Sequence, residues 1–266
     1  MRERLKRWVP RTLRERTYPL RERLGRVPGH ARADLRRWRA RRSGVPVSDL
    51  TPFEKRYSSQ NGEDGILEAI FALVGTTNRY FVEFGVEDGR VCNTRRLRER
   101  GWSGLQMDPR DPPGRGVARE FVTAENIEAL LEKHGVPPVF DLLSIDIDGN
   151  DYWVWKAIRA RRARVVVVEY NATVPPSESR TIVYDPAFRW DGTDYFGAGL
   201  RALEKLGREK GYALVGCDSR GVNAFFVDAA LVPGRFVPPP LEAMYRPFGP
   251  PHVAPPRAPG RRWVEV

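Results

Sequence analysis

The sequence YFVEFGVEDG spans residues 80–89. It begins with an apolar segment that carries the acid Glu83 near its end, and a turn with two glycines follows directly. In α/β proteins, a parallel strand that enters a helix through such a turn holds a nucleotide-like cofactor. Gly85 and Gly89 permit a tight turn and a close approach of the backbone to other groups. This stretch therefore predicts a buried strand followed by a cofactor-binding turn.

The turn does not carry the GxGxxG motif of dinucleotide-binding folds. Residues 83–89 read ExGxExG, with Glu87 where those folds have glycine. The carboxylates of Glu87 and Asp88 repel a pyrophosphate and attract a positively charged sulfonium. The turn therefore favours S-adenosylmethionine over NAD as the cofactor.

A second predicted strand, residues 102–108, also ends in an acid. Asp108 lies 25 residues after Glu83, and an acid at this place in dinucleotide folds accepts the hydroxyl groups of the cofactor's ribose. A third strand is expected at residues 120–123, followed by a helix that ends at Gly135. We therefore expect a parallel sheet with the cofactor at its carboxyl edge.

Polar side chains also follow the next two predicted strands. The sequence FDLLSIDIDG, residues 140–149, ends with Asp146 and Asp148, and RVVVVEYN, residues 164–171, ends with Glu169 and Asn171. The carboxyl ends of neighbouring parallel strands meet at one edge of a sheet. Two interpretations remain open, because these oxygens suit either a Mg²⁺ ion or the hydroxyl group of a substrate.

Residues 58–75, SSQNGEDGILEAIFALVG, predict a helix with one apolar face and Asn61 as its N-cap. Its start carries more polar groups than a cap requires, namely Gln60, Glu63 and Asp64. They either line a pocket beside the cofactor or form a charged first turn, which the helix dipole favours.

The second half of the chain predicts a long insert, a helix and a hairpin. Residues 174–196 show no clear periodicity, and loops of this length are usually lids or binding loops. Two interpretations remain open for this insert: a structured surface loop, or contacts for a polar, ring-shaped substrate from Arg180, Tyr184, Arg189, Trp190 and Asp191. A helix beginning at Asp194 precedes two strands at residues 212–218 and 223–227, and from Pro233 on 10 of 34 residues are proline.

The basic charge is concentrated at the N-terminus. Residues 1–42 hold 16 Arg or Lys against 4 acids, whereas the other residues hold 29 against 30, although the whole chain carries +11. We therefore predict a basic extension, 1–50, a catalytic domain, 51–232, and a proline-rich tail, 233–266. The neutral domain argues against a nucleic-acid partner.

The basic extension has two open interpretations, a solvated segment or a surface for anionic lipid headgroups. The first 30 residues have no apolar segment typical of an export signal, and no apolar run is long enough to span a membrane. We therefore expect a cytoplasmic protein, with peripheral contact to the inner membrane face as the alternative.

These residues resemble the FkbM-type family of S-adenosylmethionine-dependent methyltransferases over roughly residues 53–228. The resemblance rests on Glu83, Gly85 and Gly89 in the turn and on Asp146, Asp148 and Gly149 after the fourth strand. Val86 replaces the usual alanine, and Ser144 replaces a lysine often found there, so a role for that lysine does not carry over.

The resemblance implies a Rossmann-like class I methyltransferase fold. This fold is a mostly parallel seven-stranded α/β sheet with helices on both faces and a C-terminal antiparallel hairpin. It implies that Glu83, Gly85 and Gly89 border the methionine part of the cofactor, and that Asp108 binds the ribose. Asp146 would lie beside the cofactor, and Asn126 near the adenine.

The resulting hypothesis is an O-methyltransferase that acts on a hydroxyl of a sugar, a glycolipid or a glycosylated small molecule. Asp146 would accept the proton, while Asp148 and Glu169 orient the acceptor or, with Asn171, a Mg²⁺ ion. The alternative is a catalytically inactive binding or scaffold protein of cell-envelope glycan assembly. The sequence leaves homo-oligomerisation open.

Overall fold

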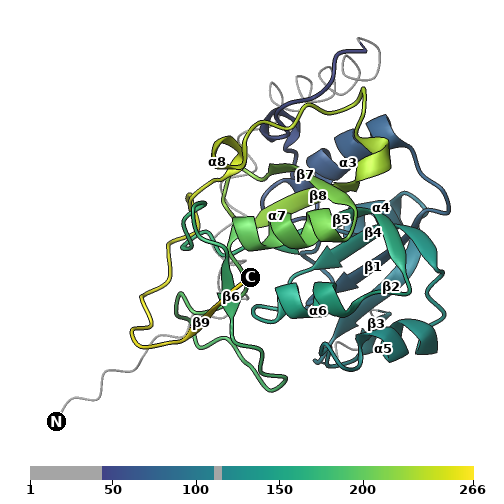
Figure 1. The fold of residues 1–266 in the computed structure, drawn as a ribbon. Coiled ribbons are helices and arrows are strands. Elements are labelled where there is room, and N and C mark those ends of the chain that lie inside the picture. Colours follow the sequence, from purple (N-terminus) through teal and green to yellow (C-terminus); the bar gives the residue numbers. More distant parts are fainter. Residues whose placement is uncertain (1–43, 111–115) are drawn as a thin grey trace, which may run out of the picture.

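The computed structural model describes residues 44–110 and 116–266, and it contains a seven-stranded sheet with the order β3-β2-β1-β4-β5-β8-β7 (Figure 1). β8 pairs antiparallel with β5 and with β7, and the other pairings in this sheet are parallel. The predicted mostly parallel α/β sheet with a C-terminal antiparallel hairpin is therefore confirmed. The strands are β1 (Tyr80–Phe84), β2 (Ser103–Asp108), β3 (Val117–Arg119), β4 (Val139–Ile145), β5 (Arg162–Glu169), β7 (Tyr212–Cys217) and β8 (Asn223–Asp228).

The valine run of β5 explains why the sheet is covered on both faces. Val165 and Val167 pack into one hydrophobic cluster, and Val166 and Val168 pack into another on the opposite face. Successive side chains of a strand point to opposite faces. A continuous run of β-branched residues is therefore stable only where both faces are buried.

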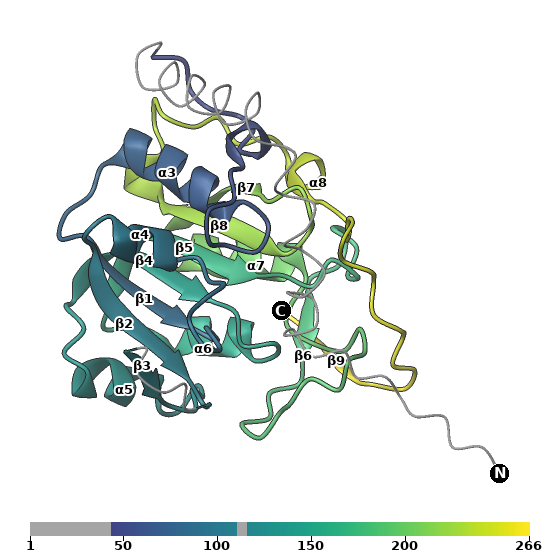
Figure 2. The ribbon, with the colours of Figure 1, turned by 180° about the vertical axis from the view of Figure 1, so that it is seen from behind.

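Helices cover both faces, as predicted. Figures 1 and 2 show α3 and α4 on one face and α5, α6 and α7 on the other. The side chain of Trp155 in α6 packs on Phe226 of β8, with ring centroids 4.9 Å apart. The helices are α3 (Glu63–Val74), α4 (Arg95–Glu99), α5 (Ile127–Lys133), α6 (Asp151–Ala157), α7 (Leu200–Glu209) and α8 (Leu241–Met244), with short 3-10 turns at Thr51–Phe53 and Ala229–Leu231.

Two predicted helix starts and one predicted strand are wrong. The N-cap of α3 is Gly62 instead of Asn61, and the N-cap of α7 is Gly199 instead of Asp194. The third strand lies at Val117–Arg119 instead of residues 120–123. Arg119 pairs with Asp108, the last residue of β2, so residues 120–123 lie beyond the end of this pairing.

The insert and the tail form a second, separate sheet. β6 (Arg180–Ile182) pairs antiparallel with β9 (Trp263–Glu265), so the end of the chain lies beside the insert. Before the domain, Val47 exchanges backbone hydrogen bonds with residues 235 and 237, and Leu50 is buried. Residues 1–43 of the predicted basic extension lie outside the described residues, and no helix in the described part could span a membrane.

Buried and half-buried acids join residues 54–64 to the hairpin of β7 and β8. Glu54 accepts hydrogen bonds from the backbone nitrogen and the hydroxyl of Ser219, at 2.5 and 2.7 Å. Glu63 accepts one from Asn223 Nδ2 at 2.9 Å. Burial raises the pKa of Glu54, of Glu63 and of Asp218, that of Asp218 to about 8.

We expect the free energy of unfolding to fall as the pH rises from about 5 to about 8. Each of these three carboxyls holds its proton more tightly in the folded chain than in the unfolded chain. The stabilisation is therefore complete below the ordinary pKa values of 3.8 to 4.5 and is lost as the folded carboxyls ionise. Urea unfolding followed by tryptophan fluorescence measures this slope.

Glu54→Gln should make the slope shallower, because the charge that repels Glu63 and Asp218 is gone. The amide oxygen still accepts from the backbone nitrogen of Ser219, and the amide nitrogen donates to the Ser219 hydroxyl instead of a carboxylate oxygen accepting from it. Glu265→Gln, at an exposed position of β9, is the matched control and should leave the slope unchanged. Stability that stays flat or rises across this pH range would contradict the argument.

Candidate functional site

A cavity of about 370 Å³ opens at the carboxyl edge of the sheet. Its floor is formed by residues at the ends of β1, β2, β4 and β5, which is the edge where open α/β sheets bind ligands. Its walls come from the insert and the tail, which lie next to this edge. The floor residues include Gly85, Met107, Asp108, Asp146 and Glu169, and the walls include Phe188, Arg189, Trp190, Phe196, Phe248, His252 and Val253.

Gly85 brings the ends of β1 and β4 into contact. Its φ is +73°, and a Cβ atom at this position would lie 1.6 Å from the carbonyl oxygen of Asp146. No other residue fits there, because both the backbone conformation and the space exclude a side chain. Gly85 therefore holds the first turn against the loop that carries the acids.

Asp108 lies at the cavity, but its carboxylate is engaged by protein groups. It accepts hydrogen bonds from the backbone nitrogen of Glu87 at 2.7 Å and from Arg110 Nε at 2.8 Å. Arg110 also contacts Glu87, at 3.0 Å, and its side chain is 58% exposed. A ribose that binds Asp108 would have to displace this guanidinium. The guanidinium can move into the solvent, because the Arg110 side chain is already largely exposed.

Glu83 and Gly89 do not line the cavity. The carboxylate of Glu83 is buried and accepts hydrogen bonds from the backbone nitrogens of Asn93 and Thr94, at 2.8 and 3.2 Å. Burial raises the pKa of Glu83. Glu83 therefore holds the segment that leads into α4, and its carboxylate does not face the cavity.

Asn126 also lies outside the cavity lining. Its Oδ1 accepts a hydrogen bond from the backbone nitrogen of Thr123 at 2.8 Å, and its Nδ2 donates to the carbonyl of Phe121 at 2.8 Å. Phe121 and Val122 do line the cavity. Asn126 therefore shapes the loop that forms the wall, while the apolar side chains of that loop face the ligand space.

The structure brings together three of the acids that the sequence singled out. Carboxylate oxygens of Asp146, Asp148 and Glu169 all lie within 4.8 Å of one another, and the three side chains are half-buried. Like charges at this spacing in a partly dry site repel one another. A bound cation or a hydrogen-bonding substrate would stabilise the group.

Asp151 secures the loop that carries two of these acids. Its carboxylate accepts hydrogen bonds from the backbone nitrogens of Ile147 and Gly149, both at 2.9 Å. Burial, opposed by these hydrogen bonds, raises the pKa of Asp151 to about 7. Asp148 has a φ of 56°, a strained conformation for a residue with a side chain and one that recurs at functional sites.

Asn171 is not part of this acid group. Its Oδ1 accepts from the backbone nitrogen of Thr173 at 2.9 Å, and its Nδ2 donates to the carbonyls of Asp194 and Phe196, both at 2.8 Å. These bonds hold the end of the insert against β5. The amide therefore has a structural role here, and Asn171 is not among the residues that line the cavity.

Asn150 lines the cavity, and the sequence analysis missed it. Its Nδ2 donates to the carbonyl of Asp185 at 2.8 Å, which fixes the amide. Its Oδ1 is buried and has no hydrogen-bond partner among the described residues. An unsatisfied buried carbonyl in a cavity lined by acids is a further ligand oxygen for a cation or a hydroxyl.

Aromatic walls face the acids, and only part of them could be predicted. Arg189 and Trp190 of the insert line the cavity as expected, whereas Arg180, Tyr184 and Asp191 do not. Arg189 stacks over Phe121 at 4.0 Å. Phe248 and His252 were missed, because the proline-rich tail has no periodicity that assigns a direction to its side chains.

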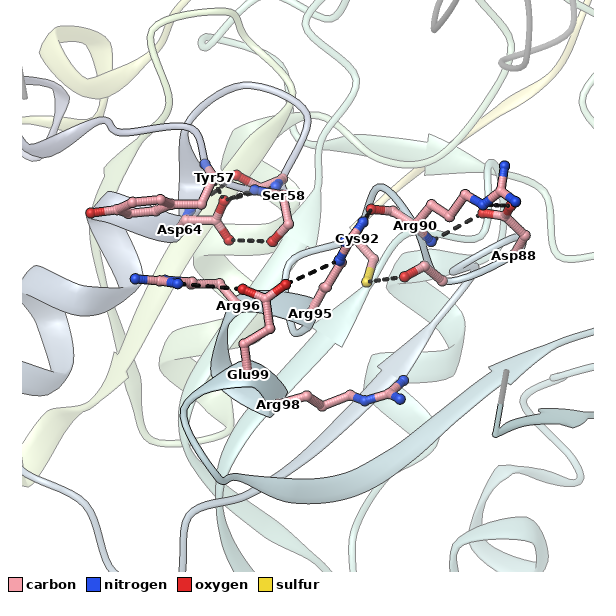
Figure 3. Close-up of polar contacts among 12 residues, drawn as sticks. Tyr57, Ser58, Asp64, Asp88, Arg90, Cys92, Arg95, Arg96, Arg98 and Glu99 are labelled. Atoms are coloured by element: carbon pink, nitrogen blue, oxygen red, sulfur yellow. Dashed lines mark hydrogen bonds and ion pairs between the residues drawn. The ribbon is translucent and has the colours of Figure 1, made fainter. Parts of the chain in front are cut away.

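Of the polar residues at the start of α3, Gln60 lines the cavity, whereas Glu63 and Asp64 are buried. The carboxylate of Asp64 accepts hydrogen bonds from the backbone nitrogens of Tyr57 and Ser58 (Figure 3).

Comparison with known proteins adds little to this geometry. Neither a protein-family model nor the sequence of a curated protein matches the chain. Among solved structures, TnmH aligns with 15% identity and a TM-score of 0.35 over 81% of this chain and 64% of TnmH. The chain thus spans less than two thirds of TnmH, and a likeness this distant carries no argument about function.

We expect Arg110→Ala to tighten the binding of S-adenosylmethionine by roughly ten-fold, about 1.4 kcal/mol. The substitution removes the guanidinium that competes with a ribose for Asp108, and it leaves the acids that attract a sulfonium. Isothermal titration calorimetry at fixed ionic strength measures the dissociation constant.

Arg90→Ala is the matched control, because it also removes an arginine that contacts an acid of the turn after β1. Arg90 contacts Asp88 at 3.1 Å (Figure 3), is 57% exposed and does not line the cavity. Its substitution should change the affinity by about two-fold or less. Weaker binding in Arg110→Ala would mean that Arg110 holds the cofactor instead of competing with it.

Proposed function

We propose that this protein is an S-adenosylmethionine-dependent O-methyltransferase that acts on a ring hydroxyl of a sugar or a glycosylated small molecule. The observation that carries the proposal is one cavity with two chemically different halves. One half, over β1 and β2, has an acidic turn and Asp108. The other half, over β4 and β5, has the acid group Asp146, Asp148 and Glu169 beneath aromatic walls.

The cofactor half suits an adenosine with a cationic sulfur. Apolar side chains of Met107, Phe121 and Val122 line it, and they offer a surface for a flat adenine ring. Asp108 is the acceptor for ribose hydroxyls, and Glu87 adds negative charge near the expected position of the sulfonium. An acidic turn of this kind favours a sulfonium over a phosphate-bearing cofactor.

The acceptor half suits a hydroxyl-bearing ring. Side chains of Phe188, Trp190, Phe196 and Phe248 give flat apolar surfaces, and the acids below them accept hydrogen bonds from hydroxyl groups. Sugars combine hydroxyl edges with apolar faces, so this lining fits them. Binding energy from such contacts holds the hydroxyl in line with the methyl group, and positioning alone supplies roughly 7–11 kcal/mol of a barrier.

We further propose that Asp146, Asp148 and Glu169 hold a Mg²⁺ ion that orients the acceptor. Mg²⁺ binds oxygen at 2.0–2.1 Å in octahedral geometry, so neighbouring ligands lie about 3.0 Å apart and opposite ones about 4.2 Å apart. The oxygens of the three acids lie within 4.8 Å of one another, so each needs to move by about an ångström at most to close on the ion. Asn150 Oδ1 is a candidate further ligand. The side chain of Asn171 is not, because its oxygen and nitrogen are both engaged in other hydrogen bonds.

The test combines binding with transfer. We expect S-adenosylmethionine to bind in calorimetry, and we expect S-adenosylhomocysteine to form with 4-nitrophenyl hexopyranosides when MgCl₂ is present. Asp148→Asn should lower the transfer rate by roughly 100-fold and abolish Mg²⁺ binding, while the affinity for S-adenosylmethionine stays within about three-fold. Mass spectrometry of the product identifies the methyl ether.

Glu178→Gln is the control, because Glu178 is a partly exposed acid outside the cavity that pairs with Arg180. It should leave both binding and transfer unchanged. No binding at millimolar S-adenosylmethionine would refute the proposal. Transfer to catechol without transfer to any hexopyranoside would keep the methyltransferase but refute the sugar acceptor.

A further inference from the structure

His252, from the proline-rich tail, lies in the wall of the cavity on the acceptor side. Gln60, Val222 and Phe248 also line the cavity. The other titratable side chains that line the cavity in the described residues are carboxylates and arginines. His252 is thus the lining side chain whose ordinary protonation change lies nearest neutral pH.

The orientation of the imidazole is determined by Asn61. Asn61 Oδ1 lies 2.8 Å from His252 Nε2, and Asn61 Nδ2 donates to Glu63 Oε1 at 3.1 Å. The contact with Glu63 fixes which end of the amide faces the ring. Because an amide oxygen only accepts, Nε2 carries the hydrogen, and Nδ1 is the nitrogen that takes up a proton.

The amide itself is anchored in the core of the domain. Glu63 is buried in the first turn of α3, accepts the backbone nitrogen of Asn61 at 2.7 Å, and also accepts Asn223 Nδ2 at 2.9 Å. Asn223 begins β8. The chain of contacts from β8 through Glu63 and Asn61 therefore orients a histidine that lies almost two hundred residues away from Asn61 in sequence.

We propose that His252 is the general base of methyl transfer and that Asn61 is its positioning residue. This inference rests on the function proposed above. The acceptor hydroxyl loses its proton to Nδ1 of His252 as its oxygen forms a bond to the methyl carbon. The bond from that carbon to the sulfonium sulfur breaks, and the products are a methyl ether, S-adenosylhomocysteine and an imidazolium.

This assignment replaces Asp146 as the base. A carboxylate that binds a cation has its lone pairs engaged and is a poor proton acceptor. In the described part of the chain, the charged side chains that line the cavity with His252 are six carboxylates and two arginines, so the carboxylates outnumber the cations around the imidazolium that forms. They are Glu87, Asp108, Glu120, Asp146, Asp148 and Glu169, with Arg110 and Arg189. General-base catalysis by a positioned histidine contributes about 10²–10⁴-fold to a rate.

The first test reads the tautomer directly, without an acceptor. Full-length protein labelled with ¹⁵N-histidine is examined by two-dimensional NMR near pH 8, with His252→Gln used to assign the signal. We expect His252 to carry its hydrogen on Nε2, and we expect Asn61→Leu to shift the population toward the other tautomer. A hydrogen on Nδ1 in the wild-type protein would overturn the proposal.

The second test is kinetic, with the hexopyranoside that supports transfer as the probe. His252→Gln should lower kcat by 10²-fold or more while the affinity for S-adenosylmethionine is unchanged. Asn61→Asp should move the acidic limb of the pH–rate profile upward by roughly one pH unit, because a carboxylate stabilises the imidazolium. A merely structural role of Asn61 would lower the rate without moving this limb.

His134→Gln is the control, since His134 contacts Glu120 at the end of α5 and does not line the cavity. It should keep the wild-type rate and pH profile. An active wild-type protein whose His252→Gln variant keeps its rate and its profile would overturn the assignment of His252 alone. A wild-type protein that binds no S-adenosylmethionine overturns the proposed function, and the role of His252 with it.

Discussion

The contact between Gly85 and the carbonyl of Asp146 is the constraint on which the cavity depends. A side chain at residue 85 would place its first carbon 1.6 Å from that oxygen. The turn after β1 and the loop after β4 can therefore meet only because one of them has no side chain. This contact holds the acidic turn after β1 directly beside the loop that carries Asp146 and Asp148.

The acids of this protein divide into two groups with different roles. Glu83, Asp64 and Asp151 are buried, and their oxygens accept backbone hydrogen bonds that hold loops in place. Such bonds offset the cost of burying a carboxylate. Asp146, Asp148 and Glu169 instead line the cavity from neighbouring strand ends. The loop-holding acids thus fix the backbone on which the cavity-lining acids stand.

The insert and the tail decide the shape of the acceptor half. Phe188 packs against Gly149, where a Cβ atom would lie 2.4 Å from its ring, so the insert rests directly on the loop of the acids. The pairing of β6 with β9 fixes the end of the tail beside the insert. The acceptor half is therefore built from segments outside the regular sheet, which is the common arrangement where one scaffold carries many specificities.

The sequence predicts the sheet, its buried valine strand, the glycine turn and the acids at the strand ends, because each depends on local periodicity or on a single residue type. It also predicts that Asp146, Asp148 and Glu169 lie together, since neighbouring parallel strands end at one edge. Other roles became visible only in the folded chain: Glu83 and Asn126 support loops, Asn171 holds the insert, and Asn150 and His252 line the cavity. These roles depend on side-chain direction in irregular segments and on partners such as Asn61 and His252, which are far apart in sequence and which no local pattern can pair.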